Sequence, residues 1–212
     1  MSKTLKIALA KGTLFTGAVE FLKSKGINVH DIDEKRKLIK STDIDGSKNY
    51  DFDKIEALLV RGHDVPFYVE SGAADLGVVG VDVVKDSGCK VMELKDLDYG
   101  HCRLCVCGRD GEYKSLSQLP NYVKIATTFP NISKEFFTKR GLDVEIINLY
   151  GSVELGPLTG LSDVIVDLVA SGKTLKENKL EVIDEIMPCT ARLITNEVSF
   201  KFFRNSLLEL AS

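Results

Sequence analysis

The residues best suited to chemistry lie between Gly151 and Leu175, where the chain reads GSVELGPLTGLSDVIVDLVASGKTL. An acidic residue, Asp167, follows an apolar run there, and a loop of small and polar residues comes soon after it: Ala170, Ser171, Gly172, Lys173 and Thr174. Backbone N–H groups at the start of a helix hold a phosphate well, glycine lets the backbone approach closely, and hydroxyl groups add donors. A carboxylate at the end of a buried strand can accept hydrogen bonds from ribose hydroxyls. This stretch therefore indicates a site for a phosphorylated sugar, with an ordinary strand-to-helix turn as the alternative.

The formal net charge of the chain is −3, so the chain is not basic overall. The positive charge that a phosphate requires must therefore come from a few individual lysine or arginine residues. Lys11 stands in a Lys-Gly turn directly after the apolar run 5–10. Turns at the carboxyl ends of strands are where open α/β sheets bind ligands. Lys11 could meet a phosphate there, or it could be an ordinary solvated lysine.

Three further acidic residues have two interpretations each. Asp64 and Asp82 stand where helices are expected to begin, so both are either helix caps or ligand contacts. Asp163 lies four residues before Asp167 and therefore on the same face of the expected strand. It either contacts a ligand or caps the preceding turn.

The five cysteines indicate a reducing compartment and not a disulfide framework. Cys102, Cys105 and Cys107 lie close enough together to suggest a metal site. The segment CRLCVCG reads as a strand, however, on which Cys105 and Cys107 share one face while Cys102 takes the other. No second ligand pair stands at finger-like spacing, so we expect small core residues and not a metal centre.

The composition is that of a globular chain of 212 residues, with 44% hydrophobic and 28% charged residues. The mildly acidic balance argues against a general binder of nucleic acids or membrane surfaces. The N-terminus leads directly into the run 5–10, which is too short for a signal-peptide core, and no apolar run approaches the roughly 18 residues that span a bilayer. We expect a cytoplasmic protein.

The elements that must position these residues alternate between strands and helices along the whole chain. Short apolar runs bounded by glycines predict the strands, and helical periodicity predicts the helices between them, including one terminal helix at 198–210. The charged segment 95–101 reads as a connection, and no internal sequence repeat is visible. We expect an α/β fold of two lobes with a cleft between them, lobe I from residues 1–94 and 186–212 and lobe II from 95–185.

Several blocks of the sequence, in order, resemble the ATP phosphoribosyltransferase family over essentially the full length of the chain. The Lys11-Gly12 turn matches one block, and the glycine-rich stretch 61–82 matches a second. Ala126-Thr127 with Pro130-Asn131 matches a third, and GSVELGPLTGL with the acidic and small residues after it matches the most specific block. The resemblance implies two α/β lobes similar to the type II fold of periplasmic binding proteins.

The resemblance also implies the first reaction of histidine biosynthesis. N1 of ATP attacks C1 of 5-phosphoribosyl 1-diphosphate, which releases diphosphate and gives N1-(5-phosphoribosyl)-ATP. Mg²⁺ is the implied cofactor, and because the diphosphate carries it, no protein ligands are expected for the metal. Such a displacement depends on positioning and on stabilising the charge of the leaving group more than on a protein nucleophile.

For the phosphoribosyl group, the resemblance assigns roles to the residues of the opening stretch. The loop 170–174 is expected to hold the 5-phosphate, and Asp167 is expected to hold the ribose hydroxyls. Glu154 matches the glutamate of the family in that segment and is expected near the ribose or the nucleotide.

For the diphosphate, the implied cations belong to the first lobe. Arg36, in an Arg-Lys-Leu block typical of the family, is expected to reach the diphosphate with the help of Lys11, and Arg61 is a weaker candidate. Cys102 matches a family position near the hinge that lines the cleft, although burial explains a cysteine there equally well.

One residue departs from the pattern of the family. Thr13 follows the Lys-Gly pair, where the family usually has arginine. A guanidinium at that position could hold a phosphate through two charge-assisted hydrogen bonds. We therefore expect either slower turnover or a substitute cation.

The chain resembles the short form of the family, which lacks a C-terminal regulatory domain that binds histidine. The short form works with a separate regulatory subunit similar to histidyl-tRNA synthetase. The resemblance thus implies a hetero-oligomer, expected to be a hetero-octamer with a homodimeric catalytic core, in which the partner supplies feedback inhibition.

Two other functions stay open at this point. Two α/β lobes around a cleft also describe a non-catalytic small-molecule-binding protein, against which the lack of an export signal and the phosphate loop both count. A phosphoribosyltransferase that acts on a free base shares the motif of an acidic strand followed by a loop, but it does not explain the Lys11-Gly12 block or the block at 61–82.

Overall fold

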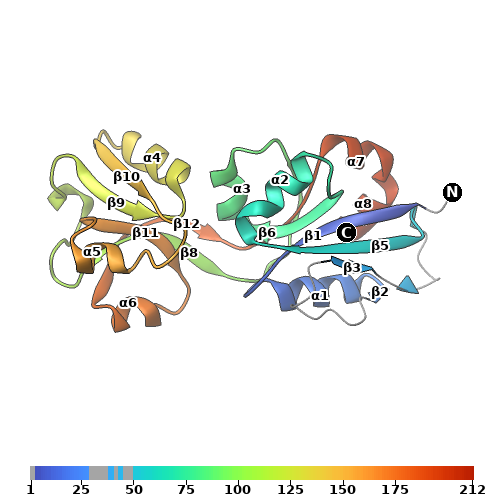
Figure 1. Ribbon diagram of the computed structural model, residues 1–212, viewed down its shortest axis with the longest axis horizontal. Helices are drawn as coiled ribbons and strands as arrows, with labels where there is room; N and C mark the ends of the chain where they lie inside the picture. The colour runs from blue at the N-terminus through green and yellow to red at the C-terminus, as the bar shows by residue number, and fades with distance from the viewer. Residues whose placement is uncertain (1–2, 29–37, 41–42, 45–49) are drawn as a thin grey trace. The chain divides into compact units, whose positions relative to one another are not determined.

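The structure, a computed structural model, describes residues 3–28, 38–40, 43–44 and 50–212. It divides the chain into two compact units, unit 1 from Met1–Gly100 with Thr190–Ser212 and unit 2 from His101–Cys189 (Figure 1). The chain passes between the units a few residues after the boundaries expected from the sequence. The reason is that the strand at 92–96 belongs to the sheet of unit 1 and the strand at 180–189 to the sheet of unit 2.

Unit 1 is built on a six-stranded sheet in the order β3-β5-β1-β6-β13-β7. Its central strands are parallel, with β1 (Thr4–Ala10) between β5 (Lys54–Val60) and β6 (Leu76–Gly80). The other three run antiparallel to their neighbours: β3 (Leu38–Lys40), β7 (Met92–Asp96) and β13 (Ala191–Thr195). Every residue of β6 is buried, which explains why it reads as a continuous apolar run.

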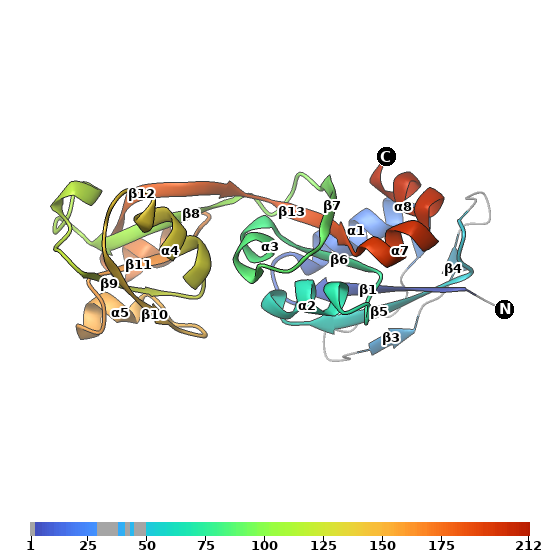
Figure 2. The same cartoon turned by 90° about the horizontal axis from the view of Figure 1, so that it is seen from above.

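Helices cover both faces of this sheet. On one face, α1 (Phe15–Ser24) and α8 (Arg204–Ala211) add side chains to one hydrophobic cluster, while α2 (Val65–Glu70) and α3 (Val81–Ser87) lie on the other (Figure 2). The unit also holds a 3₁₀ turn, η1 (Gly62–Asp64), and a separate pair of short strands, β2 (Ile27–Asn28) and β4 (Asp43–Ile44).

The terminal segment forms two helices, where the sequence predicted one. α7 (Glu197–Phe202) begins at Asn196, whose side-chain oxygen accepts a hydrogen bond from the N–H of Ser199 at 2.8 Å. The backbone leaves the helical conformation at Phe203, and its ring is buried in the cluster beneath α8. Burial of this ring therefore outweighs the helical periodicity of the sequence. In the described ranges, no helix combines the length and the hydrophobicity that crossing a bilayer requires.

Unit 2 is built on a five-stranded sheet in the order β10-β9-β11-β8-β12. Three strands are parallel, with β9 (Val123–Thr127) between β10 (Val144–Asn148) and β11 (Val164–Val169). β8 (Cys102–Arg109) and β12 (Leu180–Cys189) complete the sheet in antiparallel orientation. One face carries α4 and the other carries α5 and α6 (Figure 1); the helical segments of the unit are η2 (Leu116–Gln118), α4 (Pro130–Thr138), α5 (Leu155–Thr159) and α6 (Lys173–Glu177).

β8 confirms the strand predicted for the cysteine-rich segment. Cys105 and Cys107 are buried in the hydrophobic cluster that α6 also enters, whereas Cys102 is half-buried. Burial raises the pKa of both Cys105 and Cys107 thiols. Among the residues that the structure describes, no group of three His, Cys, Asp or Glu side chains is placed to hold a metal ion.

The two units share one topology, although the sequence shows no evident repeat. In each, the chain forms a middle strand (β1 or β9), then a neighbour on one side (β5 or β10), and then crosses to the other side (β6 or β11). An aspartate precedes each of these last strands and accepts a backbone hydrogen bond at 2.8 Å, Asp75 from Lys6 and Asp163 from Lys124. The two members of each pair are 69 residues apart in unit 1 and 39 apart in unit 2, so the different spacing hides the repeat.

Candidate active site

The carboxyl edge of the parallel strands in unit 2 is the place where this topology favours a ligand. β9, β10 and β11 all end there, and a helix follows each of them. The chain goes from β9 to β10 on one side and returns to β11 on the other, so the two connections diverge between β9 and β11. Open α/β sheets bind ligands at such switch points. The loop 170–172 lies at this edge, directly after β11.

Asp167 lies at the same edge, two residues before the end of β11, and is half-buried. Its Oδ1 atom accepts a hydrogen bond from the N–H of Leu168 at 2.8 Å. Burial raises the pKa of its carboxyl, the hydrogen bond from Leu168 opposes that shift, and the negative charge of Glu154 adds to it. The fold thus holds this carboxylate in an unfavourable environment, which is characteristic of functional sites.

Glu154 reaches this edge from the neighbouring connection. It occupies the position before α5, is half-buried, and makes no capping hydrogen bond to the described helix. Its negative charge contributes to the raised pKa of the Asp167 carboxyl, although 13 positions separate the two residues in the chain. Carboxylate oxygens can accept hydrogen bonds from the hydroxyl groups of a sugar.

The loop at 170–172 opens a helix, α6, as the pattern of small residues predicted. Gly172 has a φ of 74°, in the left-handed region that glycine adopts without strain, and this turn leads from β11 into α6. The Oγ atom of Ser171 accepts a hydrogen bond from the N–H of Lys173 at 3.4 Å. Ala170, Ser171 and Thr174 are exposed, so a ligand can reach the backbone N–H groups of the first turn of α6.

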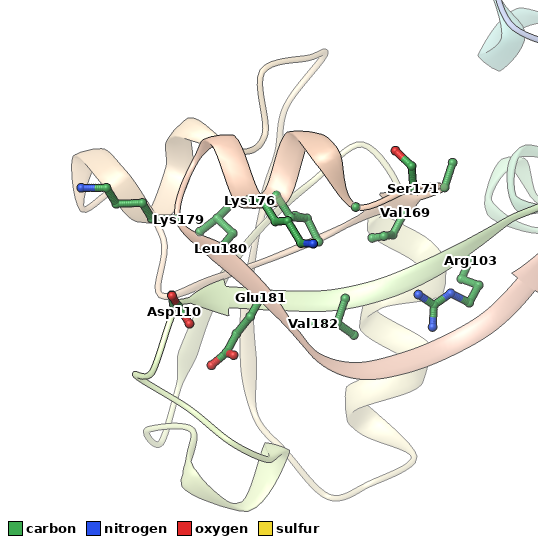
Figure 3. Close-up of a pocket in the computed structure, with 12 residues that line it drawn as sticks. Arg103, Asp110, Val169, Ser171, Lys176, Lys179, Leu180, Glu181 and Val182 are labelled. Carbon is green, nitrogen blue, oxygen red and sulfur yellow. The ribbon is translucent and has the colours of Figure 1, made fainter.

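A pocket of about 440 Å³ lies beside α6 and is lined by residues of α6, β8, β12 and the adjoining loops (Figure 3). The loop residues 170–172 form part of its wall, and the side chain of Lys176 points from α6 toward the strands (Figure 3). Arg103 lies at the same end as Ser171, whereas Asp110 lies at the other end (Figure 3). Residues from β8, β12 and α6 thus enclose one side of the loop 170–172.

Arg103 is a candidate that sequence reasoning missed. Its Cα partner on β11 is Val169, and the partner of Cys105 is Asp167, so Arg103 projects from the same face of the sheet as Asp167. It forms an ion pair with Glu185 at 3.1 Å. Periodicity placed Arg103 on a strand, but only the register between β8 and β11 places it beside the loop.

In unit 1, Lys11 and Arg61 also stand at the carboxyl edge of parallel strands. Lys11 and Thr13 follow β1, Arg61 follows β5, and all three residues are exposed. The connections of β1, β5 and β6 diverge in the same way as those of unit 2, so these residues flank a second switch point. Arg36 lies outside the described residues.

The two acidic residues near this edge of unit 1 differ in burial. Asp64 is exposed and makes no side-chain cap to the described part of α2. Asp82 is 4% exposed in the first turn of α3, and burial raises the pKa of its carboxyl, which hydrogen bonds from the backbone of Asp82 and Val83 and the proximity of His63 oppose. These backbone bonds favour the capping interpretation for Asp82.

Asp163 lies at the opposite edge of the sheet from Asp167. It precedes β11, and its Oδ2 atom accepts a hydrogen bond from the N–H of Lys124 at the start of β9. The sequence left its role open, and this bond gives it a structural one. Cys102 opens β8, half-buried, on the face opposite to Asp167.

Comparison with known proteins identifies the family. Residues 61–212 match the family described as HisG, ATP phosphoribosyltransferase. The ATP phosphoribosyltransferase of Synechococcus sp. (strain JA-2-3B'a(2-13)) is 43% identical over 99% of this chain and 90% of its own length. The chain belongs to the ATP phosphoribosyltransferase family. Its activity is therefore that of a pentosyltransferase in the first step of histidine biosynthesis.

Solved structures support the same assignment and show the fold. The ATP phosphoribosyl transferase (HisG:HisZ) complex from Thermotoga maritima contains a chain that is 32% identical, with a TM-score of 0.79, over 97% of this chain and 93% of that one. The VFT2 domain of Bordetella pertussis BvgS aligns over 98% of this chain and 86% of its own with a TM-score of 0.61, at 13% identity. The second likeness confirms the two-lobed α/β fold expected from the sequence and carries no information on activity.

Proposed function

We propose that the carboxyl edge of unit 2 holds the phosphoribosyl group of 5-phosphoribosyl 1-diphosphate during attack by N1 of ATP. The loop 170–174 binds the 5-phosphate through its backbone N–H groups, and Asp167 and Glu154 accept hydrogen bonds from the ribose hydroxyls. The observation that carries this proposal is the half-buried Asp167 carboxylate near the end of β11, at the same edge of the sheet as the left-handed turn at Gly172 and next to the switch point. Arg103 is a further candidate contact from the wall of the loop.

Positioning and charge stabilisation account for the chemistry in this proposal. Attack on C1 forms a C–N bond to N1 of the adenine ring and breaks the C1–O bond to diphosphate, which leaves with both bonding electrons. Lys11, Arg36 and Arg61 supply the positive charge that the departing diphosphate requires. Fixed orientation of the two reactants lowers the barrier because translational and rotational freedom is lost on binding and not at the reaction step.

A Mg²⁺ ion would arrive with the diphosphate of the substrate. Mg²⁺ usually keeps several waters and binds the phosphates of a substrate. Diphosphate oxygens and waters would supply its ligands, and Glu154 and Asp167 would remain available for the ribose hydroxyls. The ion would neutralise part of the charge of the diphosphate. The chain's own residues would orient the ribose and the 5-phosphate.

The assembly proposed for this chain includes a HisZ-type regulatory subunit. The support is the Thermotoga maritima structure, which is a HisG:HisZ complex and whose aligned chain is covered to 93%. We extend this to a hetero-octamer around a homodimeric catalytic core, in the cytoplasm, where a biosynthetic enzyme meets ATP. Mass measurement of the two purified proteins after mixing tests the stoichiometry.

A matched pair of variants tests the site. Asp167 and Asp163 are both half-buried, lie on the same face, and stand at opposite edges of the sheet. Asp167→Ala should raise KM for 5-phosphoribosyl 1-diphosphate about tenfold or more, because hydrogen bonds to a charged group contribute roughly 1.5–3 kcal/mol. Asp163→Ala should leave that KM unchanged and lower Tm. The measurement is product absorbance with ATP, 5-phosphoribosyl 1-diphosphate and Mg²⁺, in the presence of the regulatory subunit. Equal effects of the two variants on KM would contradict the proposal.

A further inference from the structure

Cys102 and Cys189 stand opposite each other where the chain enters and leaves unit 2. Cys102 is the first residue of β8, Cys189 is the last residue of β12, and the two are Cα partners in the antiparallel ladder. The chain enters unit 2 between residues 100 and 101 and leaves it between residues 189 and 190. The pair therefore lies at the base of both segments that connect the units.

The geometry of the ladder matches the geometry of a disulfide. Directly opposite residues of an antiparallel pair have Cα atoms about 4.5–5.5 Å apart, and their side chains project from the same face. A disulfide requires a Cα separation of about 4.4–6.8 Å. Neither residue forms a disulfide in this structure. Their register thus fits the range of Cα separations that a disulfide spans.

The other three cysteines are placed differently. Cys105 and Cys107 project from the opposite face of β8, are buried, and have thiol pKa values raised by burial. Their partners on β12 are Glu185 and Val182, so neither has a cysteine across the ladder. Cys89 belongs to unit 1 and is half-buried, like Cys102. The register thus selects one pair out of five cysteines.

We propose that Cys102 and Cys189 form a reversible disulfide, which makes the base of the connection a redox-sensitive site. The half-buried Cys102 thiolate attacks a small disulfide, RSSR, to form a mixed disulfide and release RS⁻. Cys189 is only 2% exposed, but its thiolate needs no access to solvent. It attacks the sulfur of Cys102 in the mixed disulfide and releases the second RS⁻. Two protein thiols are oxidised to one disulfide, and RSSR is reduced to two RSH.

The cross-link would act on segments that already pair with each other. Beyond Cys102 and Cys189, the N–H of Leu97 donates to the carbonyl of Ala191, and the N–H of Ala191 donates to the carbonyl of Tyr99, each at 2.9 Å. A covalent bond at the adjoining rung would fix both connecting segments to each other. The expected effect is a several-fold loss of kcat that a reductant reverses, and this part rests on the proposed function, which uses residues of both units.

The experiment treats the full-length chain with oxidised glutathione and identifies disulfides by peptide mass spectrometry. We expect a Cys102–Cys189 linkage, two hydrogen atoms lighter than the reduced peptides, in the wild type and in Cys89→Ser, the control for a second half-buried thiol. Cys189→Ser should show normal reduced activity, accumulate the glutathione adduct at Cys102, and form no internal disulfide. Cys102→Ser should form neither the glutathione adduct at position 102 nor the internal disulfide.

Two results would overturn the inference. One is a wild-type adduct at Cys102 that never resolves to the internal disulfide, and the other is oxidation of Cys89 or Cys105 in preference to this pair. The kcat of a fully cross-linked sample is compared with that of the same enzyme after treatment with dithiothreitol. Equal kcat values would overturn the proposed regulatory effect of the disulfide. Turnover of the reduced enzyme tests the proposed function separately, since no disulfide is present in that assay.

Discussion

At the scale of single residues, the pair of carboxylates in unit 2 is the feature that structural stability alone does not explain. Asp167 is half-buried, and the charge of Glu154 lies close to it, with one backbone N–H as compensation. Such an arrangement costs free energy whenever both groups are ionised. Proteins retain costly residues of this kind where activity requires them.

Replacement of Asp167 by asparagine should therefore stabilise the fold at neutral pH. The raised pKa means that the native state binds this proton more tightly than the unfolded chain does. Below the ordinary carboxyl pKa both states are protonated and the residue has no cost, whereas above the native pKa the native state holds a disfavoured charge. Asp167→Asn should thus raise Tm at pH 7 to 8, and the gain should disappear as the pH falls through the native pKa toward 4.

Thermal unfolding followed by circular dichroism across this pH range measures the effect, with KM for 5-phosphoribosyl 1-diphosphate measured alongside. Asp163→Asn serves as the control, because Asp163 is bonded to the backbone of Lys124 and should give no gain in Tm. A Tm for Asp167→Asn below that of the wild type at pH 8 would show that the carboxylate stabilises the fold.

Thr13 allows a test in the opposite direction, in which a contact is added. It is exposed in the turn after β1, beside Lys11, so an arginine side chain can be accommodated without repacking. Thr13→Arg should raise kcat/KM for 5-phosphoribosyl 1-diphosphate by about tenfold or more, because a hydrogen bond to a charged group contributes roughly 1.5–3 kcal/mol. Thr13→Lys separates charge from bidentate geometry. Unchanged or lower kcat/KM for Thr13→Arg would show that position 13 does not contact the leaving group.

The sequence pointed to candidate site residues where the signal was local. Asp167 and the loop after it stand out because an apolar run, a carboxylate and a glycine turn are adjacent in the chain. Glu154 was found only through the family resemblance, since nothing local indicates that its connection lies beside β11. Arg103 could not be found, because its place depends on the register of β8 against β11.

At the scale of elements, the loop 170–174 depends on one backbone conformation. Gly172 has a φ of 74°, and a Cβ atom there would meet no other atom within 4 Å. Gly172→Ala thus introduces backbone strain of roughly 1–2 kcal/mol without a steric clash. The loop can relieve that strain by changing the direction of the N–H groups that are proposed to bind the 5-phosphate. KM for 5-phosphoribosyl 1-diphosphate should therefore rise severalfold.

Gly160 is a matched control in the same unit. It ends α5 with a φ of 75°, and a Cβ atom there would also meet nothing within 4 Å. Gly160→Ala should lower Tm by about the same few degrees as Gly172→Ala, because each carries the same strain. Its KM should be that of the wild type. Equal KM values for the two variants would mean that the loop backbone does not contact the phosphate.

The order of strands and helices was largely predictable, but their three-dimensional pairing was not. Continuous apolar runs identify β1, β5, β6, β9 and β11 because parallel strands are covered on both faces. The break between α7 and α8 depends on the burial of Phe203, which periodicity does not register. The strand β12 extends to Cys189 since it pairs with β8 along its length, and that pairing moves the boundary of unit 2.

At the scale of the whole molecule, the two units are variations of one arrangement with different residues at equivalent edges. Unit 1 presents Lys11 and Arg61 after its parallel strands, and unit 2 presents Asp167, Glu154 and the glycine turn. Cations suit a diphosphate, whereas carboxylates and backbone N–H groups suit a ribose and a single phosphate. The edge of unit 1 thus suits a diphosphate, and the edge of unit 2 suits a ribose 5-phosphate.

Feedback by histidine provides the test at this scale, because it asks whether the catalytic chain or its proposed partner carries the regulatory site. The support for a partner is the Thermotoga maritima HisG:HisZ complex, in which this chain covers 93% of the aligned chain. Histidine can lower activity only by binding one state of the assembly more tightly than another, and such couplings are typically about 5- to 150-fold. We expect the purified chain to be insensitive to histidine and to become inhibited when a HisZ-type subunit is added. The measurement is initial rate against histidine concentration for the chain alone, for the mixture, and for the mixture with a subunit that cannot bind histidine. Equally strong inhibition of the chain alone would place the regulatory site on this protein and remove the main reason for a partner.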